Sequence, residues 1–582
     1  MAFCLPTQTA SEFLKGLRDG KIDPIKMAEM SSAERRAVFE KYVGAEDAHF
    51  VNAAFEEKLL LKDFKKGLVS WAKKVTGLST VAKRDLLSRI DKVNHVFSPE
   101  EEKAFLQDYV SNKVGATVTL EEAQKIAEFS QKDVALRQNF DAQKGLEIFK
   151  KDKSNYDAGW SSTEARLEWG RNHKLYERYI NELKGKENPS FIKEFKAHPI
   201  GTLGSILKGI QAAFDDSFFG RQARRVLSRN PKKWSSELVQ SLKNGAQQLK
   251  GKDVMLAIES DIVSRPAAML GYFDAMKVDV GVKFEEAFPS HLPERVPILG
   301  DLYKASEVMF NGSALRLRAW LAEQMIGTAE QAGLNMLDPR DAKGVGYLVN
   351  EMTGRGHLGA LEPVAGNVNV LVFSLRYLKA NIDALTLHQT NMRSIESLAT
   401  RKFVRKQAAQ NLVKVVAQTA VVLGIANLLM PGSAELDPRS ANFGKIRIGK
   451  TRIDITGGMG AIITLASHVV FSWHNGKFSV WYKSTTTGKW TDLYAGKYGQ
   501  MTPLDAIINF GEGKLSPIAG VLRDVWKGKV FGGAPATPKN LLYGATTPLP
   551  VQTGIELLKN KESAPFLLGM IADALGFSTN TY

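Results

Sequence analysis

The chain has 582 residues, 44% of them hydrophobic and 24% charged, which excludes a disordered chain and predicts three or four packing units. Its net charge of +16 favours nucleic acid, an acidic partner or anionic lipid; the alternative is a solvated basic surface without a specific partner. The single cysteine, Cys4, excludes an internal disulfide framework and a cysteine-rich zinc site. The first residues lack the basic and apolar segments of a secretory signal.

Residues 1–200 predict a charged helical N-terminal domain. Ser or Thr is followed three positions later by Glu at four places, the pattern of a capping box at a helix N-terminus: Ser31/Glu34, Ser98/Glu101, Thr119/Glu122 and Ser161/Glu164. Between Leu61 and Leu78, apolar residues recur at steps of three and four, while lysines occupy the opposite side. This spacing predicts an amphipathic helix in a bundle, with its basic side in solvent.

Residues 201–430 predict a more apolar helical domain that carries two basic clusters. Apolar residues surround the helix predicted from Leu315 to Ile326, which is typical of a buried helix. The first basic cluster stands beside aromatic residues, a combination that suits phosphates and stacked bases. We therefore predict sequence-independent nucleic-acid binding, with solvated helix faces as the alternative, at Arg221, Arg224, Arg225, Arg229, Lys232 and Lys233, and at Arg401, Lys402, Arg405 and Lys406.

An apolar run extends from Val415 to Met430. It is shorter than the roughly 20 residues that span a bilayer and it contains Gln418, Thr419 and Asn427, so a buried core helix is favoured. The basic residues upstream keep open a contact with an anionic host membrane. A second apolar run, Gly460 to Trp473, would then form a helical hairpin with the first, and the membrane-contacting residues would be Val415, Val416, Val421, Val422, Leu423, Ile425, Leu428 and Leu429.

After residue 430 the hydrophobic pattern changes to a period of two. Residues 445–448 and 451–455 alternate polar and apolar around Gly449-Lys450, which suits a hairpin with a type II′ turn. A second strand pair is expected at residues 478–483 and 489–494. The sequence thus predicts a mainly α fold, an elongated multi-helix assembly with a small antiparallel β-hairpin region near residues 440–495. Hairpins would occupy residues 431–500, and Gly/Pro-rich loops with short helices residues 501–582.

Three short motifs look like parts of enzymes. Gly444 to Thr451 matches the phosphate-binding P-loop, but its alternating β-formers lead into a strand where a P-loop requires a helix. Gly354 to Gly359 matches the dinucleotide fingerprint, yet a helix is expected before it. Glu259-Ser260 resembles the opening of a lytic transglycosylase motif without its continuation, so an exposed Glu259 on a helix is expected. The nine histidines show no metal-ligand spacing, and we predict no catalytic residue, cofactor or metal.

Several phrases between about Ser31 and Tyr494 carry a family resemblance. They are Ala33–Arg36, Val51–Lys62, Glu286–Pro289, Leu292–Pro297, Thr353–Gly359 and Ile455–Gly460. In these phrases the chain resembles helical regions of the large polyvalent proteins of bacteriophages. The resemblance implies a phage-encoded protein that enters the host with the DNA, as an internal core or ejection protein. Family members often join such regions to helicase, methyltransferase or polymerase modules, and this sequence contains no motif of those modules.

The expected function is that of a non-catalytic protein of the virion interior, delivered to the host cell envelope or cytoplasm. Its expected partners are other virion proteins, phage DNA bound without sequence preference, the host membrane and further copies of the chain. The first alternative is a nucleic-acid-binding accessory protein that acts in the host cytoplasm. The second is a degenerate muralytic enzyme, similar to lytic transglycosylases, that would use Glu259 as its acid.

Overall fold

The computed structural model describes residues 19, 23–74, 88–95, 117–187, 218–280, 299–359, 374–387, 397–484, 488–494, 501–530, 533–547, 549–559 and 566–581, with a few positions between 100 and 115. It is 68% helix and 7% strand, and its sheets are small and antiparallel, so the predicted mainly α fold is confirmed. The chain divides into two compact units, Met1–Gln138 with Leu175–Asn188 and Asn139–Lys174 with Pro189–Tyr582. Residues 201–430 and 431–500, predicted as separate domains, belong to the same unit.

The first unit is built from helices α2 (Pro24–Glu29), α3 (Ser32–Val43), α4 (Ala45–Lys74), α7 (Leu120–Arg137) and the second part of α9 (Thr163–Glu187). The predicted capping boxes of α3 and α7 are both present, because Ser31 and Thr119 each exchange hydrogen bonds with the Glu three positions on. The predicted box at Ser98 lies outside the described residues. At α9 the cap is shifted by one residue, since the Ser162 hydroxyl accepts from the Ala165 amide.

Helices α3 and α4 form an antiparallel pair. The Phe39 and Phe55 rings meet edge to face with centroids 5.9 Å apart, and Arg35 forms a 2.8 Å ion pair with Glu56. Helix α4 begins at Ala45, well before Leu61, where its apolar pattern was predicted to start, because Val51 and Phe55 continue its apolar side against α3. The predicted residues Val75 and Leu78 lie outside the described part of the chain.

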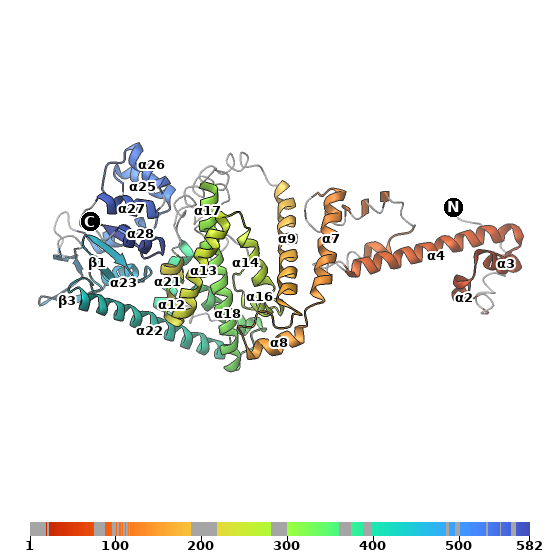
Figure 1. The fold of residues 1–582 in the computed structure, drawn as a ribbon, viewed down its shortest axis with the longest axis horizontal. Helices are drawn as coiled ribbons and strands as arrows, with labels where there is room; N and C mark the ends of the chain where they lie inside the picture. Colours follow the sequence, from red (N-terminus) through yellow and green to blue (C-terminus); the bar gives the residue numbers. More distant parts are fainter. Residues whose placement is uncertain are drawn as a thin grey trace. The chain divides into compact units, whose positions relative to one another are not determined.

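The second unit holds the larger hydrophobic core. Figure 1 labels most of the helices that surround it. The helices of this unit up to the first strand are α8 (Ala142–Lys151), the first part of α9, α12 (Arg224–Arg229), α13 (Pro231–Leu249), α14 (Val254–Val263), α15 (Pro266–Met269), α16 (Tyr272–Met276), α17 (Leu299–Glu307), α18 (Ser313–Gln331), α19 (Pro339–Met352), α21 (Leu375–Thr386) and α22 (Leu398–Leu429). Two π-helical turns, η1 (Phe218–Gln222) and η3 (Val308–Gly312), precede α12 and α18.

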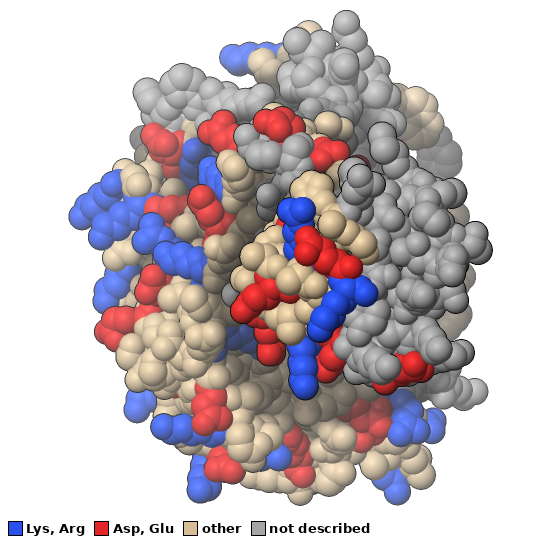
Figure 2. All heavy atoms as spheres, turned by 90° about the vertical axis from the view of Figure 1, so that its right-hand side faces the viewer, with Lys and Arg blue, Asp and Glu red and all other residues tan. Residues whose placement is uncertain are grey.

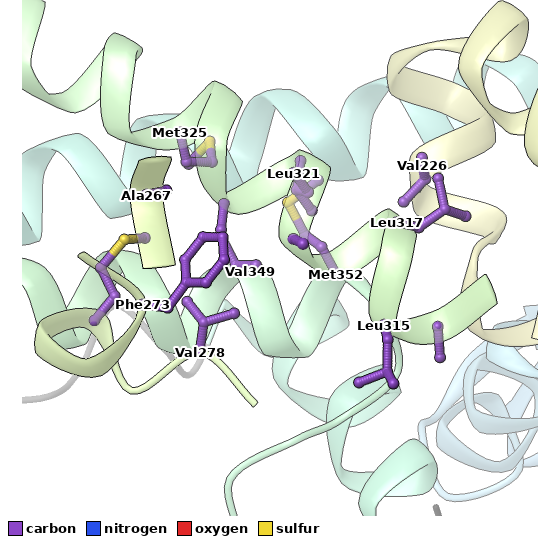
Figure 3. Close-up of a cluster of buried hydrophobic side chains, with 14 of the residues drawn as sticks. Val226, Ala267, Phe273, Val278, Leu315, Leu317, Leu321, Met325, Val349 and Met352 are labelled. Atoms are coloured by element: carbon purple, nitrogen blue, oxygen red, sulfur yellow. The ribbon is translucent and has the colours of Figure 1, made fainter. Parts of the chain in front are cut away.

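Helix α18 is the centre of this core. Leu317, Leu321 and Met325 are fully buried, and side chains from α12, α16 and α19 surround them (Figure 3). The prediction of a buried helix over Leu315 to Ile326 is therefore confirmed. Burying side chains of this size stabilises the fold by about 2 kcal/mol each relative to exposure.

The small sheet contains β1 (Lys445–Ile448), β2 (Thr451–Asp454) and β7 (Thr579–Thr581) in the order β1-β2-β7, all antiparallel. The predicted hairpin around Gly449-Lys450 is confirmed, and Gly449 has φ +60°, as the first position of a type II′ turn requires. Strand β7 comes from the far end of the chain and the sequence pattern did not predict it. It pairs Thr579 with Ile453.

The segment after this hairpin differs from its prediction. Residues 460–473 do not form one helix of a helical hairpin: α23 (Met459–Ser467) ends early and β3 (Ser472–His474) pairs with β4 (Lys477–Ser479). One strand was predicted from Phe478 to Lys483, but Phe478 lies in β4 and Lys483 in the separate strand β5 (Trp481–Lys483). The second predicted pair is shorter than expected and is formed by β5 and β6 (Trp490–Asp492).

Short helices complete the chain, as predicted for residues 501–582. They are α24 (Pro503–Glu512), α25 (Pro517–Lys527), α26 (Pro538–Thr546), α27 (Leu549–Lys559) and α28 (Phe566–Ala574). The first three begin at a proline that directly follows a capping Thr or Ser, where the missing proline N–H costs nothing.

Candidate functional site

Helix α22 is fixed at its N-terminal end and leaves the core toward its C-terminal end (Figure 1). The Ser397 hydroxyl caps the helix by accepting a hydrogen bond from the Thr400 amide. The hydroxyls of Ser397 and Thr400 donate to the Asp341 carboxylate of α19, at 2.7 and 2.8 Å. Phe403 and Val404 in the first half are buried in the main core. The first half therefore anchors the helix to the unit.

The second half of α22 is mostly exposed, so the predicted buried core helix over residues 415–430 is wrong. Only 17% of its most apolar stretch is buried, although by length and composition alone α22 is long and apolar enough to cross a membrane. The reason is that α22 contacts its neighbours along one narrow side. We call the exposed side the apolar α22 face: Val413, Val416, Ala417, Ala420, Val421, Val422, Gly424, Ile425, Leu428 and Leu429.

The polar residues of this run turn toward the protein. Thr419 accepts a hydrogen bond from Arg224 at 3.1 Å, and Gln418 accepts from the same guanidinium group. Asn427 bonds both backbone groups of Ala434, at 2.9 and 3.1 Å. These three side chains weakened the membrane interpretation of the sequence, but their hydrogen bonds are satisfied internally and leave the exposed side apolar.

Two of the eight predicted membrane-contacting residues also face inward. Val415 and Leu423 are each 3% exposed. Val415 packs with Met459 of α23 and Leu423 with Ile453 of β2. They hold α22 against the strands and cannot belong to a contact surface, whereas the other six predicted residues lie on the apolar α22 face.

The second predicted basic cluster lies on α22 itself, before the apolar face. Lys402, Arg405 and Lys406 are exposed, as is Lys414, whereas Arg401 is half-buried. The helix therefore presents a basic stretch followed by an apolar one. Such a sequence of charge and hydrophobicity matches a surface that is anionic outside and apolar beneath.

A cluster of exposed aromatic rings follows α22 in the chain. Phe471 stacks on Tyr494 with centroids 5.3 Å apart, and Trp473 lies 5.4 Å from Phe478. All four side chains are between 49% and 69% exposed. Arg439, in the loop after α22, donates to the Trp473 carbonyl at 3.1 Å. From the sequence, Phe478 and Tyr494 were expected in strands, and Phe471 and Trp473 in the apolar run from Gly460 to Trp473. Exposed aromatic residues are characteristic of membrane interfaces.

The first predicted basic cluster is largely internal. Arg224 and Arg225 are 5% and 3% exposed. Arg225 forms a 2.9 Å ion pair with Glu351 and donates to the Asn381 side chain at 2.7 Å. Arg224 donates to the Ile455 carbonyl at 3.1 Å. Both guanidinium groups hold helices and strands together, which removes them from the predicted nucleic-acid surface.

The other members of that cluster are divided among different environments. Lys233 pairs with Glu237 at 3.0 Å, Arg229 donates to Gln407 at 3.2 Å, and Arg221 lines a cavity. Lys232 alone of the six is exposed. On the face drawn in Figure 2, the described Lys and Arg side chains are interspersed with Asp and Glu.

A chain of ion pairs runs through the core around Arg265. Its guanidinium group contacts Asp261 at 2.7 Å and Glu323 at 3.4 Å, and Asp261 also pairs with Arg166 at 2.9 Å. Burial by itself lowers the pKa of Arg265, but the charges of Glu323 and Asp261 outweigh it and raise that pKa. Burial raises the pKa of Glu323 to about 7, against the opposing charge of Arg265.

This raised pKa makes the stability of the second unit depend on pH. The unfolded chain releases the Glu323 proton near pH 4.5 and the folded protein near 7, so the stabilisation is full below about pH 4.5 and is lost as the pH rises through 7. Glu323→Gln stays neutral. We expect the difference in unfolding free energy between wild type and variant to change by about 3 kcal/mol between roughly pH 5 and pH 8. Denaturant titrations measure it, with the exposed Glu147→Gln as control; a difference that is constant with pH would contradict the assignment.

The enzyme-like motifs lie in ordinary structural positions. Lys450 occupies the exposed turn of the β1–β2 hairpin, and helix α19 precedes Gly354, which has φ +79°. Glu259 was expected to be exposed but is 3% exposed, because it lies on the inner side of α14. Among the residues that the structure describes, no three or more His, Cys, Asp or Glu side chains are grouped to hold a metal.

No protein-family model matches the chain, and neither a curated protein nor a solved structure does.

Proposed function

We propose that the protein is a non-catalytic component of a phage virion interior that enters the host with the genome and binds the anionic bilayer of the envelope through α22. The observation that carries this proposal is the apolar α22 face, beside which Gln418, Thr419 and Asn427 make their hydrogen bonds inside the protein. Contiguous exposed apolar surface of this kind marks an interaction site in a folded protein.

The expected binding energy is sufficient for reversible membrane attachment. Six side chains of the face, Val413, Val416, Val421, Ile425, Leu428 and Leu429, are between 52% and 82% exposed. Transferring the exposed part of each into the acyl region contributes about 1 kcal/mol, on the order of 6 kcal/mol together. Each exposed Lys or Arg of the preceding stretch adds about 1 kcal/mol at an anionic surface.

A bilayer fits this surface better than nucleic acid does. The α22 face offers no cation over its apolar second half, and Arg224 and Arg225 are engaged inside the protein. The exposed aromatic cluster around Trp473 adds residues that favour the boundary between headgroups and acyl chains. The alternative partner for the apolar α22 face is a second copy of the chain.

Flotation of the full-length protein with vesicles tests the proposal. We expect it to float with phosphatidylglycerol-containing vesicles, to float less with neutral phosphatidylcholine vesicles, and to lose part of its binding in high salt because the basic stretch is screened. A protein that stays at the bottom of the gradient while forming a dimer whose formation protects α22 would contradict membrane binding.

The virion assignment has its own test. Mass spectrometry of purified, nuclease-treated phage particles from the source phage should detect the chain as a packaged component. Its presence only in infected-cell lysate and its absence from particles would remove the virion part of the proposal, and would leave the lipid-binding part to the flotation result.

A further inference from the structure

A cavity of about 610 Å³ lies in the second unit between α21, the β1–β2 hairpin, α23 and α24. This volume falls in the range of small-molecule sites, about 300–1,000 Å³. The cavity differs chemically from the apolar α22 face, because several charged side chains line it. The cavity therefore raises a question separate from membrane binding, namely what ligand its charges would hold.

Three cations from distant parts of the sequence line this cavity. Arg221 comes from η1, Lys445 from β1, and Lys514 from the loop after α24. Asp454, which lies opposite Lys445 in the hairpin register, is the one Asp or Glu among the described lining residues. Burial lowers the pKa of His468, so this ring is neutral at pH 7. The described lining residues thus carry an excess of two positive charges.

The two lysines lack ion-pair partners within the described part of the chain. Lys514 rests over the Phe510 ring at 5.3 Å, a contact that leaves its ammonium hydrogens available. Asp454 accepts hydrogen bonds from the amide and hydroxyl of Thr456, at 2.8 and 2.6 Å. Burial lowers the pKa of both Lys445 and Lys514, and the charge of Arg221 lowers that of Lys514 further. An anion placed among them would relieve this repulsion.

Backbone groups contribute to the same wall. Gly457 and Gly458 both have positive φ, and Gly458 is the N-cap of α23, whose Gly460 amide donates to the Thr456 hydroxyl at 2.9 Å. Asn381 donates to the Gly457 carbonyl at 3.3 Å, as does the Tyr377 hydroxyl, so this turn is held in place. The positive end of the α23 dipole is therefore at the cavity, where it adds to the charge of the three side chains.

We propose that this cavity binds a small organic phosphate monoester, with the phosphate between Arg221, Lys445 and Lys514. Such a phosphate carries a charge of about −1.5 to −2 at pH 7, which matches the excess charge of the lining. Leu378, Phe443 and Phe510 supply apolar wall for the organic part of the ligand. A free phosphate ion would satisfy the cations but leave most of the volume unfilled.

Isothermal titration calorimetry of the full-length protein tests this proposal. The probes are adenosine 5′-monophosphate, glycerol 3-phosphate and inorganic phosphate, with adenosine as the uncharged control. We expect the two esters to bind more tightly than inorganic phosphate, and adenosine not to bind. Lys514→Gln and Lys445→Gln should each weaken ester binding by about tenfold or more, since each removes a charge-assisted hydrogen bond. Lys232→Gln, which removes an equally charged but exposed side chain, should leave the affinity unchanged.

Thermal unfolding of the same variants separates lost binding from lost folding. Both substitutions remove a half-buried charge that has no ion-pair partner among the described residues, so the melting temperature should hold or rise while the affinity falls. Ester binding that is equal in wild type and in both lysine variants would overturn the proposal, as would the absence of binding at roughly 1 mM ligand. Because the vesicle experiment does not involve this cavity, neither outcome bears on the proposed membrane contact.

Discussion

Replacing both Val421 and Leu428 by aspartate is expected to abolish vesicle binding. The two side chains are 59% and 82% exposed on the apolar α22 face, so the substitutions leave the folded core untouched. Each removes about 1 kcal/mol of apolar transfer and adds a carboxylate that would have to lose its water or be repelled by anionic lipid. We expect the vesicle partition coefficient to fall by at least about 100-fold, measured by flotation at several lipid concentrations.

Two matched variants show whether the effect belongs to this face. Val239→Asp with Leu242→Asp changes two residues of α13 that are 52% and 54% exposed, and should not alter vesicle binding. Leu423→Asp, on the buried side of α22, should lower the melting temperature. Equal loss of binding in the α13 variant would mean that the apolar α22 face is not the lipid contact, and unchanged binding in Val421→Asp/Leu428→Asp would mean the same.

Replacing Arg265 by methionine should destabilise the second unit by about 3 to 5 kcal/mol. The guanidinium group is buried and pairs with Asp261 and Glu323, while the Tyr156 ring lies 4.0 Å from it. Methionine fills a similar volume but leaves the buried Glu323 and the half-buried Asp261, which keeps its ion pair with Arg166, facing an apolar side chain. Chemical denaturation of wild type and variant at pH 7 measures the difference.

Arg340→Met is the matched control for this prediction. Arg340 also pairs with an aspartate, Asp338 at 2.8 Å, but its side chain is 81% exposed. An exposed pair contributes about 0 to 1 kcal/mol, so we expect a change within that range. Similar losses of unfolding free energy in both variants would show that burial does not determine how much these ion pairs contribute to stability.

The local features of the fold were predictable because the residues that determine them are neighbours in sequence. Ser31 and Thr119 each meet a Glu three positions away, and Gly449 reverses the chain between two alternating strands. Helix α18 was predicted to be buried because apolar residues surround it, so any packing arrangement buries them. In these cases short-range geometry decides the structure.

The orientation of α22 depends on partners that are distant in sequence, and the pattern of the run could not reveal it. Gln418 and Thr419 turn inward because Arg224, nearly 200 residues earlier, donates to both. The same pairing buries a guanidinium group that a charge cluster predicts to be solvated. Strand β7 likewise joins β2 across more than 100 residues. Non-local contacts of this kind decide which side of the apolar run stays exposed.

The cavity depends on contacts between distant parts of the sequence. The meeting of Arg221, Lys445 and Lys514 could not be predicted, because these residues are separated by up to almost 300 positions. Arg221 was noted as part of a nucleic-acid cluster. Its placement beside two other cations gives it a different candidate role.

A fluorescent label on α22 tests the central claim most directly. Cys4 is the single cysteine, so Cys4→Ser with Leu428→Cys gives one site for an environment-sensitive nitrobenzoxadiazole label. On adding phosphatidylglycerol vesicles, we predict that its emission shifts to the blue and is quenched by spin-labelled lipid, whereas a label at position 242 on α13 does not change. A vesicle-bound protein whose label at 428 keeps the emission it has in water would contradict the account.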